Sequence, residues 1–236
     1  MCSIILSIGA GGVFAAANRD EMLSRPWEAP AEYWPGICGG RDQLSGGTWL
    51  GLNRAGVMAA VLNREGTLGP APGKKSRGGL PLLALQHTTA MAAAEAIGTL
   101  DGGAYRAFNL VVADAGGAVF IRGLGEGRPE VLPLAAGVHM ITAGEPDDVA
   151  RPRIAKHLPR FQAAPFAQWG RLLADSTGER ADQINVKPDE NGFGTVCASL
   201  VRLAHGSLTE HCFAAGPPDI AEFRLISWNA QHGAEY

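Results

Sequence analysis

Residues 1–21 read MCSIILSIGAGGVFAAANRDE and contain the strongest structural signal in the chain. Residues 3–8 are rich in β-formers, residues 9–12 supply a glycine-rich turn, and residues 13–18 form a second short apolar run. Two such runs around a turn predict an N-terminal β-hairpin. Because antiparallel strands return the chain to its start, the polar residues NRDE at the end of the second run should lie close to Cys2.

Further apolar runs bounded by turn residues predict more strands and a few helices. Strands are expected at residues 48–53, 57–63, 108–113, 118–122, 130–134, 138–142, 195–204, 209–214 and 223–228. Helices are expected at residues 81–97, 151–161 and 166–175. Loops are expected at residues 66–79, which are polar, and at residues 21–40, which carry three prolines. Hairpins near both ends with helices between them indicate the α+β class with mainly antiparallel sheets.

The composition describes a globular chain with low charge. With 236 residues, of which 46% are hydrophobic, the chain is long enough for one large domain spanning residues 1–236. The 32 glycines and 15 prolines show no collagen period, and the apolar content excludes intrinsic disorder. Only 18% of the residues are charged and the net charge is −3, so nucleic acid is not expected as a partner.

The cysteines and the apolar segments favour a cytoplasmic protein. The four cysteines form no C-x-x-C motif and are too few for a disulfide scaffold, which fits reduced thiols. Residues 1–20 lack the basic start of a signal peptide, and glycines interrupt their apolar run. No uninterrupted apolar run reaches the roughly 18 residues of a membrane-spanning helix, so membrane insertion is not expected.

Motifs for nucleotide, metal and serine chemistry are incomplete. A dinucleotide fingerprint starting at Gly9 would need glycine in place of Phe14, and a P-loop ending at Lys74 would need serine or threonine in place of Lys75. The six histidines show no zinc-ligand spacing, and no G-x-S-x-G motif occurs. The sequence therefore predicts no metal and no cofactor.

Cys2 offers a different chemistry. Residue 2 is small, so removal of Met1 would leave cysteine as the N-terminal residue. A new α-amine with a pKa of about 7.7–8.0 is partly unprotonated near neutral pH and belongs to the same residue as the thiol. The amine can therefore serve as the base for its own nucleophile. From its position alone, the alternative that this cysteine is incidental stays open.

The residues expected around Cys2 suit such a site. Asp20 could hold the α-amine and Arg19 could favour the thiolate, although the same residues also suit a solvated turn. The segment GGTWLG places Trp49 between glycines, where it could form a pocket wall or simply part of the core. Asn63 ends an apolar strand, where its amide could donate to an oxyanion or cap a turn.

Together these residues resemble the NRDE family, also called the transport and Golgi organisation family. The shared motifs cover the first third of the chain: Met1-Cys2, AANRDE at residues 16–21, Arg25-Pro26, residues 39–42, GGTWLG at residues 46–51 and the G-x-x-A-x-x-x-N strand at residues 56–63. FNLVVAD and FGT extend the match weakly. More remotely, the chain resembles N-terminal-nucleophile (Ntn) hydrolases of the bile salt hydrolase and penicillin V acylase type, which also begin Met-Cys.

The resemblance implies a four-layer αββα sandwich, in which two mainly antiparallel sheets lie between helical layers. It also implies hydrolysis of a non-peptide C–N amide bond, with Cys2 as nucleophile and its α-amine as base. Trp34, Trp49 and the proline-rich loop would wall an apolar pocket, so the expected ligand is a small acyl or aromatic amide. Asp20 would orient the amine, and Asn63 would lie beside the oxyanion site. The remaining candidate site residues are Arg19 and Asn18 for catalysis, and Trp34, Trp49, Arg64 and Thr48 for substrate binding.

The chain also departs from the pattern of these enzymes. In bile salt hydrolases the arginine precedes the aspartate by three residues, whereas here Arg19 is adjacent to Asp20 and should face the other side of a regular strand. Ala143 stands where family members carry the oxyanion asparagine, and Val196 stands where they carry an arginine, unless Arg202 replaces it. These losses leave a second hypothesis, a non-catalytic protein that binds or carries haem or an acyl-type ligand.

Overall fold

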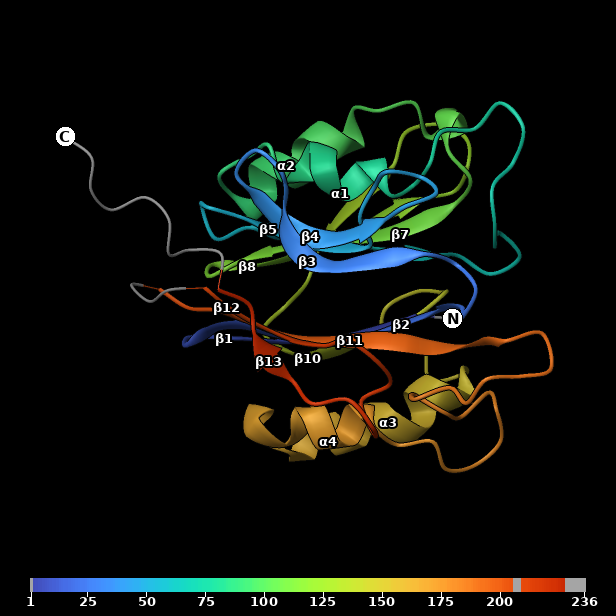
Figure 1. Cartoon of the computed structure of the whole chain (residues 1–236). Helices are drawn as coiled ribbons and strands as arrows, with labels where there is room; N and C mark the ends of the chain where they lie inside the picture. Colours follow the sequence, from blue (N-terminus) through green and yellow to red (C-terminus); the bar gives the residue numbers. More distant parts are fainter. Residues whose placement is uncertain (1, 206–208, 228–236) are drawn as a thin grey trace.

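Two antiparallel sheets lie face to face in the computed structural model, which describes residues 2–205 and 209–227 (Figure 1). The first sheet has the strand order β10-β1-β2-β11-β12-β13. Its strands are β1 (Ser3–Gly9), β2 (Gly12–Met22), β10 (Gly137–Ile141), β11 (Phe193–Leu203), β12 (Glu210–Ala214) and β13 (Arg224–Leu225). The second sheet follows the chain from β3 to β9 in order. Its strands are β3 (Trp27–Trp34), β4 (Ile37–Asp42), β5 (Leu50–Asn53), β6 (Met58–Asn63), β7 (Phe108–Asp114), β8 (Gly117–Gly123) and β9 (Glu130–Pro133).

Helices cover the outer face of each sheet, so the chain forms four layers (Figure 1). Helices α1 and α2 lie on the second sheet, and α3 and α4 lie on the first. Buried apolar clusters fill the space between the sheets and the space under each helical layer. The predicted αββα sandwich of the α+β class is confirmed. The helical elements are α1 (Gly79–Ala84), α2 (Ala90–Gly98), the 3-10 turn η1 (Gly102–Ala104), α3 (Pro152–Ala163), the 3-10 turn η2 (Phe166–Gln168) and α4 (Trp169–Leu173).

The predicted N-terminal hairpin is present, and its second strand is longer than expected. β1 and β2 pair along the whole of β1, with Ser3 opposite Asn18. At the turn, Gly12 has a φ of 111°, and a Cβ there would lie 2.1 Å from the backbone oxygen of Leu203, so the position needs glycine. β2 continues through the NRDE residues to Met22 and pairs with β11 on its other side. The NRDE residues are therefore fixed inside a sheet.

Residues 21–40, predicted to be an irregular loop, instead contain the hairpin of β3 and β4. β3 is the edge strand of its sheet, and Pro30 is tolerated there because one side of an edge strand needs no backbone donors. Pro35 and Gly36 form the turn, where Gly36 has a φ of 73° that glycine adopts without strain. The prediction was wrong because it treated these prolines as strand breakers without considering an edge position.

The single long helix predicted to begin at Pro81 is two helices, α1 and α2. The side-chain amide of Asn53 donates to the carbonyl oxygens of Leu85 at 2.9 Å and His87 at 2.7 Å, which satisfies the end of α1. Thr89 then caps α2, because its hydroxyl oxygen accepts a backbone hydrogen bond at 3.2 Å. The prediction was wrong because the break is made by capping side chains and not by glycine or proline.

The C-terminal elements agree with the prediction in part. The helix expected at residues 166–175 is the 3-10 turn η2 followed directly by α4. The strand expected at residues 223–228 is limited to β13, and Trp228 lies outside the described residues. Within residues 2–205 and 209–227, no helix is both long and apolar enough to cross a membrane.

Candidate active site

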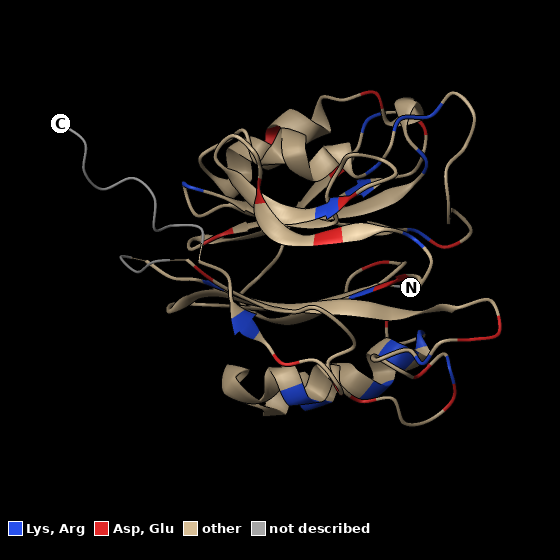
Figure 2. Cartoon of the chain, viewed as in Figure 1, with Lys and Arg blue, Asp and Glu red and all other residues tan. Residues whose placement is uncertain are grey.

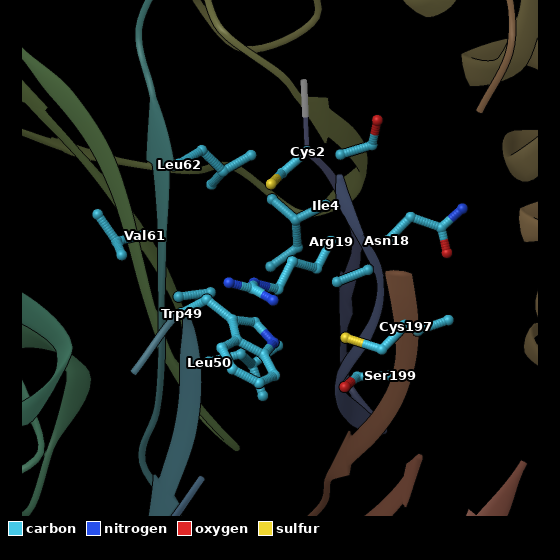
Figure 3. A pocket seen from close by; sticks show the side chains of 14 residues that line it. Cys2, Ile4, Asn18, Arg19, Trp49, Leu50, Val61, Leu62, Cys197 and Ser199 are labelled. Atoms are coloured by element: carbon cyan, nitrogen blue, oxygen red, sulfur yellow. The ribbon is translucent and has the colours of Figure 1, made fainter. Parts of the chain in front are cut away.

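The alternation of side chains along β1 and β2 sorts the candidate residues onto two faces of the first sheet. Cys2 and Arg19 lie on the face toward the second sheet, beside the apolar cluster between the sheets (Figure 3). Asn18 and Asp20 make their side-chain contacts on the opposite face, where α3 and α4 pack. This agrees with the alternation expected from the sequence. It places the guanidinium of Arg19, and not the carboxylate of Asp20, on the same face as the thiol.

The half-buried thiol of Cys2 lies against the backbone of Asp20. The sulfur accepts a hydrogen bond from Asp20 N at 3.4 Å, and the thiol can donate to Asp20 O at 3.6 Å. Burial and the negative charge of Asp20 raise the pKa of the Cys2 thiol above its ordinary value, although Arg19 opposes this shift. The thiol therefore stays protonated at neutral pH until a base removes its proton.

The carboxylate of Asp20 is buried and accepts hydrogen bonds from Thr195 and Arg153. Thr195 Oγ1 donates to Oδ1 at 2.7 Å, and Arg153 Nη1 donates to Oδ2 at 3.2 Å. Arg153 also donates to Ser3 Oγ at 3.0 Å, so the start of α3 is tied to both strands of the N-terminal hairpin. These contacts fix the backbone of Asp20 against the sulfur of Cys2.

Arg153 is a site residue that the sequence analysis did not identify. It is the second residue of α3 and lies four and eight residues before His157 and Phe161, which are buried on the same face of the helix. Arg153 itself is only 8% exposed. A cation on the apolar face of an amphipathic helix is the sequence signal that could have identified it.

Arg19 lies in the space between the sheets, beside the ring of Trp49 (Figure 3). Its Nη2 donates to Asp42 Oδ2 at 3.1 Å, and its guanidinium carbon lies 4.3 Å from the centroid of the Trp49 ring. The residue is only 5% exposed, yet Nη1 has no hydrogen-bond partner among the described residues. A fixed, buried donor without a partner is suited to receive a carbonyl oxygen or an anion of a ligand.

Asp42 organises the cations beside Arg19. Its carboxylate accepts hydrogen bonds from Arg25 Nε at 2.5 Å, from Arg25 Nη2 at 3.0 Å and from Ser45 N at 2.9 Å. Although burial opposes the shift, these hydrogen bonds from Arg25 and Ser45 hold the pKa of Asp42 below its ordinary value. Asp42 is therefore a carboxylate that keeps both arginines in place.

A cavity of about 670 Å³ opens beside the thiol, a volume suited to a small-molecule ligand. A much smaller pocket of about 20 Å³ lies next to it between the sheets, with mostly apolar walls (Figure 3). The structure thus brings several of the predicted site residues to one cavity. The predicted residues that line it are Cys2, Arg19, Asp20, Thr48, Trp49 and Asn63.

Asn18 does not present its amide to the thiol. The side-chain nitrogen donates to the backbone oxygens of Leu173 and Ile184, each at 2.9 Å, so it ties β2 to the end of α4 and to the segment after it. The structure does not bring this amide to the thiol, because Asn18 shares the helix-facing side of β2 with Asp20, and its catalytic role stays a prediction.

Trp34 and Arg64 also lie away from the cavity. Trp34 packs against the apolar cluster between the second sheet and its helices. Arg64 Nη1 donates to Asn109 Oδ1 at 2.7 Å, and Arg64 Nη2 donates to Glu145 at 2.6 Å. Both were predicted to bind substrate. The structure does not bring either side chain to this cavity, and their roles in substrate binding stay predictions.

The departures from the hydrolase pattern have clear positions in the structure. Ala143 is buried and its carbonyl oxygen accepts a backbone hydrogen bond at 3.1 Å, so it offers no side-chain donor. Val196 packs in a small apolar cluster. Arg202 lies 4.0 Å from Glu210 and 5.2 Å from the ring centroid of Phe14, at the other end of β11 from the thiol. Arg202 therefore does not replace the missing arginine.

Solved structures that share this arrangement include hydrolases of amide bonds. The N-acylethanolamine-hydrolyzing acid amidase ortholog of Caenorhabditis elegans superposes with a TM-score of 0.60, at 14% identity over 85% of this chain and 92% of that one. The conjugated bile acid hydrolase of Clostridium perfringens, as its C2A mutant, gives 0.59 at 11% identity over 100% and 99% of the two chains. These likenesses identify the fold of the chain as the Ntn hydrolase fold.

Relatives in sequence are proteins of transport and Golgi organisation. The Transport and Golgi organization protein 2 homologs of Homo sapiens and Bos taurus are each 32% identical over 145 residues, which is 57% of this chain and 51% of each relative. The chain thus spans about half the length of these relatives. A family model described as Transport and Golgi organisation 2 matches residues 1–164. The chain therefore belongs to the Transport and Golgi organisation 2 family.

Proposed function

We propose that this protein hydrolyses a non-peptide C–N amide bond, with the Cys2 thiol as nucleophile and the α-amine exposed by removal of Met1 as base. The observation that carries the proposal is the position of the sulfur, at the start of β1 and at the wall of a 670 Å³ cavity. The sulfur also contacts the backbone of Asp20 in a strand paired on both sides. The fold shared with amide hydrolases supports the same chemistry.

The first half of the proposed reaction acylates the thiol. The α-amine takes the thiol proton, and the sulfur attacks the carbonyl carbon to form a tetrahedral intermediate with a negative oxygen. The ammonium then gives its proton to the nitrogen of the substrate, the C–N bond breaks and the amine product leaves. Because burial raises the pKa of Cys2, the reaction depends on this base and not on a thiolate already present.

The second half of the proposed reaction releases the acyl group. The α-amine takes a proton from a water molecule, and the resulting hydroxide attacks the thioester carbon. The C–S bond breaks, the sulfur recovers the proton, and a carboxylic acid leaves. The reaction thus consumes one water for each amide bond.

Two side chains are suited to stabilise the negative oxygen of the intermediates. Arg19 has an unpartnered Nη1 beside Cys2, and Asn63 is among the residues that line the same cavity. Since Ala143 provides no amide, we assign Arg19 the part of the missing donor. A guanidinium suits this role because its hydrogen bonds to an anion carry a full positive charge.

A second candidate function is binding without chemistry. The losses at Ala143 and Val196 favour it, because they remove two polar groups that the related hydrolases carry. The cavity has room for an apolar ligand such as haem or an acyl compound. In this case the protein would bind its ligand equally well with or without the Cys2 thiol and would form no acyl intermediate.

Turnover by matched cysteine variants tests the proposal. Wild-type protein, Cys2→Ala and the control Cys38→Ala, whose thiol is buried in β4, would be incubated with N-acylethanolamines and acylamino acids of several chain lengths. We expect release of amine by wild type and Cys38→Ala, and a loss of about a thousandfold or more in Cys2→Ala. Intact mass should show that Met1 is absent and that acid quenching traps an acyl adduct. Equal turnover by Cys2→Ala, or a retained Met1, would overturn the proposal.

A further inference from the structure

Four cations at the wall of the cavity have no carboxylate partner among the described residues. Three come from the loop between β6 and α1, and the fourth comes from the segment before β7. Figure 2 marks Lys and Arg positions in blue along the backbone. We call them the basic rim: Lys74, Lys75, Arg77 and Arg106. The chain has only four lysines, and two of them lie side by side in this rim.

Three acidic residues are among those that line the same cavity, and arginines engage the carboxylate of each. Asp20 is bound by Arg153 at 3.2 Å, and Asp42 is bound by Arg25 at 2.5 Å. Glu21 lies 3.6 Å from Nε of the same Arg25. The basic rim therefore keeps its full positive charge, although the whole chain carries a net charge of −3.

Neutral oxygen atoms hold the arginines of the rim in place. Arg77 Nη1 donates to Thr67 Oγ1 at 2.9 Å and to Ala107 O at 3.0 Å, and Arg106 Nη1 donates to Leu68 O at 2.8 Å. These bonds order the guanidiniums without neutralising them. Burial and repulsion from Arg106 lower the pKa of Arg77 to about 10, which agrees with a site where positive charge is uncompensated.

The number of cations indicates which anion fits. A carboxylate would bring one negative charge and two acceptor atoms to four cations. A phosphate monoester brings a charge of about −1.5 to −2 and three strong acceptor oxygens. Guanidinium groups also match phosphate with paired hydrogen bonds, and ammonium groups add point charges. Phosphate is therefore the better complement to the rim.

We propose that the basic rim binds a phosphate group on the ligand whose acyl carbonyl reaches Cys2, so that the substrate is a phosphorylated acyl amide. The assignment of the carbonyl to Cys2 rests on the proposed function. The assignment of the phosphate rests on the charges of the rim alone. The unpartnered Nη1 of Arg19 and the basic rim line the same cavity, where they are suited to different parts of one ligand.

Binding of two matched compounds tests the phosphate site without turnover. N-dodecanoylethanolamine and its O-phosphate differ only in the phosphate, and calorimetry on the Cys2→Ala protein measures their Kd. We expect the phosphate compound to bind at least tenfold more tightly in 50 mM NaCl, with a smaller advantage in 500 mM NaCl because salt screens the rim. Inorganic phosphate should bind much more weakly than the acyl phosphate.

Two double lysine variants test whether the basic rim causes the tighter binding of the phosphate compound. Lys74→Gln combined with Lys75→Gln should reduce the advantage of the phosphate compound to threefold or less. The control, Lys156→Gln combined with Lys187→Gln, removes the same charge at positions that do not line the cavity, and it should keep the advantage. Circular dichroism would verify that each variant is folded.

The outcomes separate this inference from the proposed function. The phosphate site would be overturned if the two compounds bound with equal Kd or if neither bound. It would also be overturned if inorganic phosphate bound as tightly as the acyl phosphate, or if the control lysine variant lost the preference to the same extent. A preference for phosphate in binding without hydrolysis by wild-type protein would support the site and overturn the enzyme. Hydrolysis of both compounds at the same rate by wild-type protein, with equal Kd values, would support the enzyme and overturn the phosphate site.

Discussion

Arg153 Nη1 donates to Asp20 Oδ2 at 3.2 Å, and this contact connects the outer helical layer to the strand that carries the thiol contact. The side chains of Arg153 and Asp20 are 9% and 0% exposed. The backbone of Asp20 contacts the sulfur of Cys2. The ion pair therefore holds this part of β2 in place from the helix-facing side of the sheet. Because both side chains are buried, the pair acts by positioning the site.

Removing the guanidinium should therefore destabilise the whole chain. Arg153→Met removes the guanidinium that pairs with the buried carboxylate of Asp20, which we expect to lower the free energy of unfolding by about 3–5 kcal/mol. Urea denaturation monitored by fluorescence measures it. The control is Arg160→Met on the same helix, where the side chain is 41% exposed and pairs with Asp175, so the expected loss is under about 1 kcal/mol. Equal losses in both variants would contradict the structural role of the buried pair.

Arg19 should affect turnover through its geometry and not only through its charge. Arg19→Lys keeps a cation but cannot bind Asp42 and offer a second nitrogen to the ligand at once. We expect kcat to fall about 10²- to 10³-fold, as for loss of an oxyanion donor, with a smaller change in KM. Arg202→Lys, at the far end of β11, is the matched control and should leave both constants within about twofold. Steady-state kinetics would show the difference, and an unchanged kcat in Arg19→Lys would remove Arg19 from the mechanism.

The first turn of the chain should tolerate alanine at one glycine and not at the next. Gly12→Ala forces a Cβ to 2.1 Å from a backbone oxygen at a φ of 111°, so we expect a loss of at least about 2 kcal/mol in the free energy of unfolding. Gly11→Ala has nothing within 4 Å of its Cβ and should change stability by less than about 0.5 kcal/mol. Urea midpoints of the two variants provide the comparison, and similar midpoints would contradict the close approach of β11.

The fold could be predicted from the sequence where local pattern determines it. The hairpins of β1 with β2 and of β7 with β8 have apolar runs on both sides of turn glycines, and both were expected. The hairpin of β3 with β4 and the break between α1 and α2 were not expected. The first depends on Pro30 lying in an edge strand, and the second depends on Asn53 from another strand. Neither relationship is visible in a local window of sequence.

The site could be predicted where one hairpin brings its residues together. Asp20 and Arg19 lie near Cys2 because β2 returns beside β1, and this follows from the turn alone. Arg153 and Thr195 reach Asp20 from elements more than 130 residues away, so no spacing rule links them. Long-range partners of this kind depend on how the four layers pack, which local sequence patterns do not determine.

His211 should give the protein a measurable sensitivity to acid. The ring is buried, its Nε2 lies 3.1 Å from Ser199 Oγ, and its Nδ1 has no partner among the described residues. Burial lowers its pKa from 6.5 to about 4. Between these values the unfolded chain binds the proton and the folded chain does not, so the contribution of His211 is present above pH 6.5 and is lost as the pH falls toward 4.

The expected loss from this one group is about 2 kcal/mol between pH 7 and pH 5. Urea unfolding at both pH values would be compared for wild type, His211→Gln and the control His87→Gln, a half-buried histidine at the break between α1 and α2. His211→Gln should flatten the pH dependence by about this amount, because glutamine does not titrate, while His87→Gln should follow wild type. Parallel curves for wild type and His211→Gln would mean that the ring is solvated enough to accept a proton in the folded protein.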